Sequence, residues 1–239
     1  MAMALMGRGD LITLRQKIAN FAEREIIPRV DPPSQEKFPA QIWNKMGQEG
    51  FLGFNLPAKY GGGGYDHLAI VVTGEELVRH GCSLGLAFSW LLHLGTAYFL
   101  ILRFGNERQL EEYLSQLAKG RITVSLAYGE PSSGGNPKNL KTFACRQGES
   151  YILNGEKFYL TNGPIANLYV VFAITGEEGH KKRLTAFLVP KNTPGLSLTN
   201  LIDVKHLNPS PHCGLKLANC MVPREAVHPF YRFKNAGDT

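Results

Sequence analysis

The spacing of apolar residues changes once, near residues 119–121, and this change constrains the fold more than any other feature of the chain. Before it, apolar residues recur every three or four positions, as in amphipathic helices. After it, short β-branched and aromatic runs are separated by Gly, Pro and Asn turns. Helices followed by strands are typical of an α+β fold. We therefore expect an all-α domain over residues 1–120 and an antiparallel β-barrel domain over residues 121–239.

The first half predicts a bundle of helices. They are expected over residues 11–27, 39–50, 67–80, 83–104 and 107–117. Asp66 stands where an N-cap residue accepts a backbone hydrogen bond, and Ser83 begins the next helix. The helix that follows Ser83 is long and apolar enough to raise the question of a membrane span. His93 and several hydroxyls within it, together with the amphipathic helix before it, favour a helix buried in the bundle.

The second half predicts strands of three to seven residues with short turns. They are expected over residues 122–127, 141–145, 151–153, 156–160, 169–175 and 185–189. Asn154-Gly155 falls between two of them, and this dipeptide is typical of a tight β-hairpin. Antiparallel pairing follows from this pattern of short, closely spaced strands.

Two segments of the second half have the residue types of a ligand site. Residues 128–135 form a Gly/Ser-rich turn after an apolar run, and residues 157–162 form an aromatic strand that ends in a hydroxyl and an amide. Glycines let a backbone approach a ligand, and successive N–H groups bind anions. Taken singly, the turn could be a surface β-turn and the strand could be core packing. Together they suggest a pocket for a large planar cofactor with phosphates.

Composition narrows the classes of partner. The net charge is +6, but no block of five Lys or Arg residues occurs, so we do not expect a nucleic-acid partner. The four cysteines lie far apart with no C-x-x-C pair, which favours a reduced, cytoplasmic protein without a metal site.

Several short motifs occur along the chain, and their combination is more specific for one protein family than any single motif is. They are residues 21–28, 51–53 with 57–62, 75–77, 104–109 with 113–120, the turn at 128–134, Leu153-Asn154-Gly155-x-Lys157-x-x-x-Thr161-Asn162, and Met221-Val222-Pro223. With these motifs the chain resembles the first two domains of the flavin-dependent acyl-CoA dehydrogenases. The resemblance implies FAD as the cofactor, acyl-CoA as the substrate, and α,β-dehydrogenation of the acyl-CoA thioester as the reaction, in fatty acid metabolism.

The resemblance also implies roles for individual residues. The flavin-binding positions would be Ala127, Tyr128, Gly129, Tyr159, Leu160 and Thr161. Backbone groups of the first three would meet the pyrimidine side of the flavin, and Tyr159 would lie against the ring system in place of the family's Trp. The Thr161 hydroxyl would bond near the reactive nitrogen. Gly134 and Gly135 would lie near a phosphate or the pantetheine arm of the substrate.

The sequence departs from the family pattern at several positions. Gly129 replaces a Thr, Gly135-Asn136 replaces Ser-Asp, and Ser210 stands where an Arg is expected. The family carries its catalytic glutamate in a third, helical domain, and no Glu of this chain matches it. We therefore assign no catalytic residue and expect Glu130 to be structural.

These departures imply a fragment, or a subunit that is inactive and binds FAD weakly when isolated. A homo-oligomer or a second polypeptide would supply the helical domain, and an electron-transfer acceptor would reoxidise the flavin. Leu91, Leu94, Tyr98 and Leu102 are expected near that contact. Two alternatives remain open: a non-catalytic protein that binds a flavin, an acyl-CoA or a partner, and the remnant of a split gene.

Overall fold

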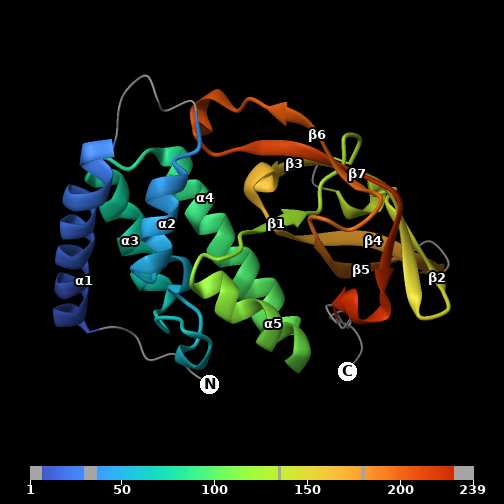
Figure 1. Ribbon diagram of the computed structural model, residues 1–239, viewed down its shortest axis with the longest axis horizontal. Coiled ribbons are helices and arrows are strands. Elements are labelled where there is room, and N and C mark those ends of the chain that lie inside the picture. The colour runs from blue at the N-terminus through green and yellow to red at the C-terminus, as the bar shows by residue number, and fades with distance from the viewer. Residues whose placement is uncertain (1–6, 30–36, 134–135, 179–180, 229–239) are drawn as a thin grey trace.

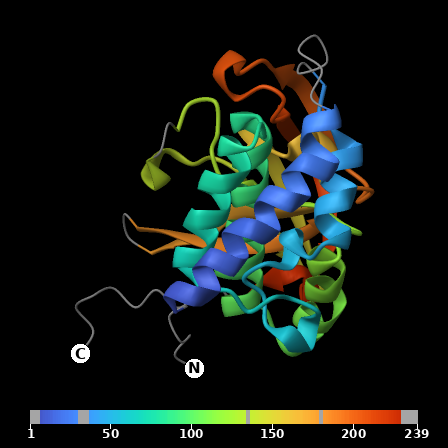
Figure 2. The same cartoon turned by 90° about the vertical axis from the view of Figure 1, so that its left-hand side faces the viewer.

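The computed structural model describes residues 7–29, 37–133, 136–178 and 181–228, with helices at one end and strands at the other (Figure 1). Figure 2 views the molecule from the helical end. The α-helices are α1 (Arg8–Phe21), α2 (Ala40–Gln48), α3 (His67–Arg79), α4 (Leu84–Gly95) and α5 (Glu107–Ala118). The order of helices before strands confirms the predicted α+β class.

Local capping explains where these helices begin. The Asp66 carboxylate accepts a hydrogen bond from the Ala69 N–H at 2.8 Å, and the Ser83 hydroxyl accepts one from the Leu86 N–H at 3.2 Å. Each bond satisfies a backbone donor that has no partner within the first helical turn. The predicted N-cap Asp66 is therefore confirmed, and Ser83, predicted as the first residue of its helix, is the N-cap of α4.

Helix α4 continues through a π-helical stretch, Thr96–Leu102, and the two together form a 19-residue apolar helix. Among the described residues it is the one helix long and apolar enough to cross a membrane, and 56% of an apolar 18-residue stretch of it is buried inside the structure. It packs against α3, α5 and β1, as the core helix of a bundle does. Of the residues predicted near a contact with another polypeptide, Leu91 is 47% exposed, whereas Leu94 is only 1% exposed and cannot itself touch a partner.

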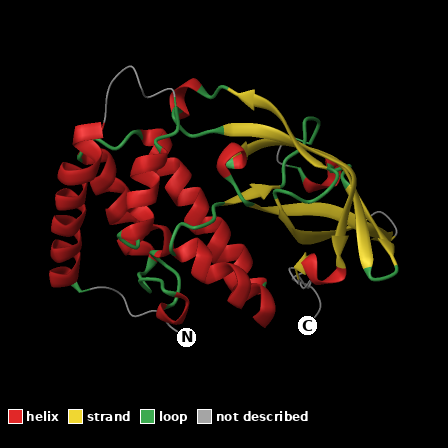
Figure 3. Cartoon of the chain, in the orientation of Figure 1, coloured by secondary structure: helices red, strands yellow, loops and turns green. Residues whose placement is uncertain are grey.

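The strands form one sheet, coloured yellow in Figure 3. They are β1 (Val124–Ala127), β2 (Phe143–Gln147), β3 (Ser150–Thr161), β4 (Leu168–Glu178), β5 (Lys181–Pro190), β6 (Leu196–Ile202), β7 (His212–Pro223) and β8 (Val227–His228). Their order is β6-β7-β3-β2-β4-β5-β8, with β1 paired to β4.

This sheet is mixed and open, so the prediction of an antiparallel β-barrel requires correction. β1 runs parallel to β4 from Val124 opposite Leu168 onward, and β2 is parallel to β4 at Phe143 opposite Ile174. Within the described strands, β6 and β8 lie at opposite ends of the path and do not pair with each other. Alternating residue patterns report which face a side chain occupies, and they do not report the direction of the neighbouring strand.

The predicted hairpin at Asn154-Gly155 is also wrong, because β3 passes through both residues without turning. The pair instead marks a shift in register against β7, where Gly155 adopts φ +146°. The Asn154 side chain accepts a hydrogen bond from the Asn219 N–H at 2.8 Å. The turn that precedes β3 lies at Gly148, with φ +58°.

A shared core joins the helices to the sheet. It contains Ala97, Ile101, Leu114 and Leu117 from the helices together with Val124, Leu168, Val170 and Leu188 from the strands. The buried Trp43 indole also donates a hydrogen bond to the Thr123 hydroxyl at 3.2 Å. These contacts hold α4 against β1 and fix the walls of the pocket described next.

Candidate functional site

A pocket of about 190 Å³ lies between α4 with its π-helical continuation and the strands β1 and β3. Its lining residues are Leu92, Thr96, Val124, Leu126, Tyr128, Gly129, Phe158, Tyr159 and Thr161. Leu92, Val124, Leu126 and Phe158 give this lining an apolar part, and the side-chain hydroxyls come from Thr96, Thr161, Tyr128 and Tyr159. No Asp or Glu is among these described lining residues.

The structure brings together four of the six residues predicted to bind a cofactor. Tyr128, Gly129, Tyr159 and Thr161 line the pocket. The side chains of the other two, Ala127 and Leu160, are fully buried in the core of the sheet, so these residues can offer a ligand only backbone groups. The predicted substrate positions Gly134 and Gly135 lie outside the described residues.

Tyr159 projects from the sheet because its backbone is not that of a regular strand. It has φ +56° at a shift in register between β3 and β7, and its side chain is 62% exposed. A left-handed conformation at a non-glycine residue costs energy and often marks a functional position. The exposed ring lies edge-on to Phe158 with 4.6 Å between ring centroids, and it offers a flat apolar surface at the pocket.

The residues that follow β1 form the neighbouring part of this wall and offer unused backbone donors. The Tyr128 and Gly129 N–H groups donate to no group in the described part of the chain, while the Gly129 carbonyl accepts from the Phe158 N–H at 2.9 Å. A Cβ at Gly129 would lie 3.3 Å from the Phe158 carbonyl oxygen, so glycine keeps this wall close to β3. The Ser125 hydroxyl donates to the Thr161 carbonyl oxygen at 2.7 Å and ties β1 to β3.

A buried ion pair supports this wall from behind. The Lys157 ammonium donates to Glu130 Oε1 at 2.9 Å and to the Tyr128 carbonyl oxygen at 3.0 Å. The Glu130 carboxylate also accepts from the backbone N–H groups of Lys141 and Thr142, at 2.6 Å and 2.9 Å. Burial alone would raise the pKa of Glu130, but hydrogen bonds from Thr142 and Lys157 hold this pKa below its usual value. Glu130 is therefore a structural carboxylate, as the sequence predicts.

Thr161 has a partner that sequence reasoning missed. Its hydroxyl lies 3.1 Å from His212 Nε2, and the other ring nitrogen of His212 lies 2.9 Å from the Ser210 carbonyl oxygen. Thr161 and His212 are directly opposite each other in the pairing of β3 with β7. No local motif predicts a contact between residues so far apart in sequence, because the contact depends on the register of the two strands.

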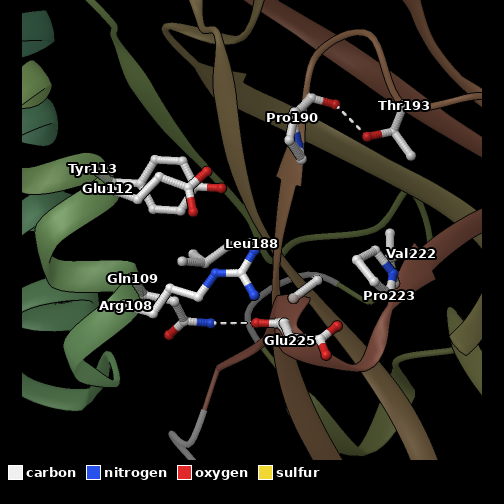
Figure 4. Close-up of a pocket in the computed structure, with 11 residues that line it drawn as sticks. Arg108, Gln109, Glu112, Tyr113, Leu188, Pro190, Thr193, Val222, Pro223 and Glu225 are labelled. Carbon is white, nitrogen blue, oxygen red and sulfur yellow. Dashed lines mark hydrogen bonds between the residues drawn. The ribbon is translucent and has the colours of Figure 1, made fainter. Parts of the chain in front are cut away.

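Further pockets lie beside α5 and beside His212. One, of about 250 Å³, lies between α5 and the sheet (Figure 4), and in it Gln109 donates to the Glu225 carbonyl oxygen at 2.9 Å. The other, of about 390 Å³, is lined by residues 201–203 and 208–212 together with Phe38. The described residues contain no group of three or more His, Cys, Asp or Glu side chains arranged to hold a metal ion.

Comparison with known proteins identifies two matching family models. The model described as acyl-CoA dehydrogenase, N-terminal domain, matches residues 10–121, and the one described as acyl-CoA dehydrogenase, middle domain, matches residues 125–220. Both matches agree in position with the helical and strand-rich parts of the structure.

Individual relatives extend this similarity along the chain. A mitochondrial isovaleryl-CoA dehydrogenase of Pongo abelii is 34% identical over 215 residues, which cover 88% of this chain and 50% of that protein. The mitochondrial short-chain specific acyl-CoA dehydrogenase of Rattus norvegicus is 34% identical over 95% of this chain and 55% of that protein. A solved structure described as an FAD complex of PigA matches with a TM-score of 0.87 and 26% identity, over 97% of this chain and 60% of that one. The chain thus spans about half the length of the curated relatives it matches.

Proposed function

The chain belongs to the acyl-CoA dehydrogenase family, and we propose that it forms the flavin-binding and acyl-CoA-binding part of an FAD-dependent enzyme. The proposed reaction is α,β-dehydrogenation of an acyl-CoA thioester. The observation that carries the proposal is the pocket in which a hydroxyl, two unused backbone N–H groups and an exposed aromatic ring meet.

The donor set of this pocket fits FAD. The ring system of a flavin has carbonyl oxygens and ring nitrogens that accept hydrogen bonds, and the backbone N–H groups of Tyr128 and Gly129 can supply them. Tyr159 offers a flat surface for stacking, and the Thr161 hydroxyl is within the same lining. When bound, FAD would accept the two electrons that the acyl chain loses. The residues of this chain bind and orient the ring system and exclude water from one side of it.

Removal of the substrate α-proton requires a base from elsewhere. A general base must lie within hydrogen-bond reach of the proton it takes. No carboxylate is among the described residues that line the pocket, and Glu130 is committed to Lys157 and to two backbone N–H groups. The base therefore comes from residues beyond those described, in the same polypeptide or in another.

An apolar surface next to the pocket is the proposed contact for those residues. Leu91 and Phe99 of the long helix are exposed, and so are Leu68 and Val71 of the neighbouring α3. The His67 ring lies 5.8 Å from the Phe99 ring, which places the two helices side by side here. Exposed apolar side chains of this kind are typical of interfaces. We assign this face to helices of an oligomer or of a second polypeptide, with a separate electron-transfer acceptor reoxidising the flavin.

The absence of a carboxylate from the described pocket lining favours one alternative function, a non-catalytic protein that holds a flavin or an acyl-CoA. The two functions differ in one respect. Adding the polypeptide that supplies the base would restore dehydrogenation of an acyl-CoA in the first case, and it would produce no turnover in the second.

Titration of the purified chain with FAD, followed by the visible absorption of the flavin, tests the proposed function. We expect a saturable spectral change. Tyr159→Ala should weaken FAD binding, because the flavin ring system then loses the aromatic surface on which it stacks. Met221→Ala removes an exposed apolar side chain on β7 outside the pocket lining, and it serves as the matched control. No spectral change at millimolar FAD, or equal loss in both variants, would contradict the proposal.

A further inference from the structure

His212 lies behind the pocket wall, where it connects two cavities. It is buried at the first position of β7, directly opposite Thr161 at the end of β3. Thr161 lines the pocket of about 190 Å³, whereas His212 lines the neighbouring pocket of about 390 Å³. The hydrogen bond between them therefore links the candidate flavin site to a second group that can gain or lose a proton.

The hydrogen-bond partners of His212 determine where its proton lies. The Ser210 carbonyl oxygen, 2.9 Å from Nδ1, can only accept, so Nδ1 must carry the proton. In a neutral imidazole the other nitrogen, Nε2, then has a lone pair and accepts. Nε2 lies 3.1 Å from the Thr161 oxygen, so the Thr161 hydroxyl donates its proton to His212. The lone pairs of the Thr161 oxygen remain available to the pocket.

The surroundings of His212 favour the neutral ring. Burial lowers the pKa of His212 below its usual value. The contacts of its ring with described residues are to the Thr161 hydroxyl, the Ser210 carbonyl oxygen and the Phe88 ring, and none of these groups carries a charge. Transfer of a charged group into such an environment is unfavourable unless the charge is paired. The neutral tautomer with a proton on Nδ1 is the form that this site stabilises at pH 7.

The ring is also held in a fixed orientation. The Ser210 hydroxyl lies 2.8 Å from the Ser89 hydroxyl, and the Asn162 amide donates to the Ser89 carbonyl oxygen at 2.8 Å. Phe88 stacks on His212 with 6.5 Å between ring centroids. Helix α4 thus anchors both the strand end that carries Thr161 and the segment that holds His212.

We propose that His212 is a positioning residue that turns Thr161 into a hydrogen-bond acceptor toward the pocket, so that the site favours reduced over oxidised flavin. This inference rests on the proposed function. The reduced flavin carries a proton on its reacting nitrogen, N5, and the oxidised flavin does not. An acceptor beside that nitrogen stabilises the protonated form, by an amount set by one hydrogen bond.

The first experiment measures the tautomer without any flavin. Long-range ¹H–¹⁵N correlation spectra of the ¹⁵N-labelled full chain at pH 7 distinguish the two ring nitrogens, and His212→Leu identifies the His212 signals. We expect a protonated Nδ1 and an unprotonated Nε2, with the Nε2 shift changing in Thr161→Val. A protonated Nε2 in the unaltered chain would overturn the proposal, and it would do so independently of flavin binding.

The second experiment compares the dissociation constants of oxidised and chemically reduced FAD, without oxygen, in a double-mutant cycle. We expect the reduced form to bind about threefold to tenfold more tightly, a preference that Thr161→Val removes and Thr161→Ser retains. His212→Leu should remove the same preference but have no further effect when Thr161 is already Val. A structural role for His212 would produce an effect that persists in the Thr161→Val background.

The outcomes separate the two proposals. If neither form of FAD binds the unaltered chain, the proposed function fails and the flavin preference fails with it. If both forms bind equally well, only the preference is overturned. If His212→Leu does not fold, the tautomer of the unaltered chain and the comparison of Thr161→Val with Thr161→Ser still decide the matter.

Discussion

Replacing Lys157 with Met should destabilise the chain by about 3–5 kcal/mol, because it removes one partner of a buried ion pair. The Lys157 side chain is fully buried and the Glu130 side chain almost fully so. Met retains the length of the aliphatic stem but loses both hydrogen bonds of the ammonium, to Glu130 and to the Tyr128 carbonyl oxygen. The Glu130 carboxylate keeps its two backbone N–H donors but no longer has a counter-charge.

The size of this effect makes it measurable. The total free energy of unfolding of a domain is about 5–15 kcal/mol, so a loss of about 3 kcal/mol is a large part of it. Urea titrations followed by circular dichroism at pH 7 give the free energy of unfolding by linear extrapolation. Lys216→Met is the matched control, because Lys216 lies on the exposed face of β7, and a surface change of this kind alters stability by about 0.5 kcal/mol or less.

The same variant should also weaken FAD binding, since Lys157 holds the Tyr128 carbonyl and so supports the wall with the free N–H groups. A loss of less than about 1 kcal/mol in Lys157→Met would refute the account of the ion pair. If the variant loses the expected stability but its folded fraction binds FAD with unchanged affinity, the ion pair stabilises the fold without supporting the binding site.

Two further predictions concern stability. Burial lowers the pKa of both His93 and His228 to about 4. As the pH falls, these histidines take up protons in the unfolded chain before they do so in the folded one. The free energy of unfolding should therefore be unaffected by them above about pH 6.5 and should fall as the pH drops toward 4, by roughly 2 kcal/mol for each histidine at pH 5. Equal unfolding free energies at pH 7 and pH 5 would contradict this. Gly155→Ala should lower the free energy of unfolding by at least about 2 kcal/mol, because φ is +146° and a Cβ would lie 2.5 Å from the Thr142 hydroxyl oxygen. Gly148→Ala is the control, because Gly148 also has a positive φ but has open space around it. Similar melting temperatures for the two variants would refute the steric argument.

Features encoded by neighbouring residues were predictable from the sequence. The N-cap Asp66 acts on the N–H group three residues away, so its effect depends on local order alone. The helical half and the pocket positions of Gly129 and Thr161 follow from such signals together with the family motifs.

Features that depend on which strands pair could not be predicted in the same way. The direction of β1 relative to β4 is set by the long connection after β1, and no alternation of side chains records it. Asn154-Gly155 has the composition of a hairpin, but β7 pairs with both sides of it and keeps the strand extended. His212 reaches Thr161 only through the register of β3 with β7, so its role became visible only in three dimensions.

The central claim is that the wall formed by β1 and the end of β3 binds the flavin ring system, and mapping FAD binding on the backbone amides tests it most directly. Titration of the ¹⁵N-labelled chain with FAD up to millimolar concentration should shift the amide signals of Tyr128 and Gly129 and those of residues 159–161 first. The matched region is the pocket beside α5, where Arg108 and Gln109 should remain unaffected. Shifts concentrated at α5, or none at saturating FAD, would contradict the account.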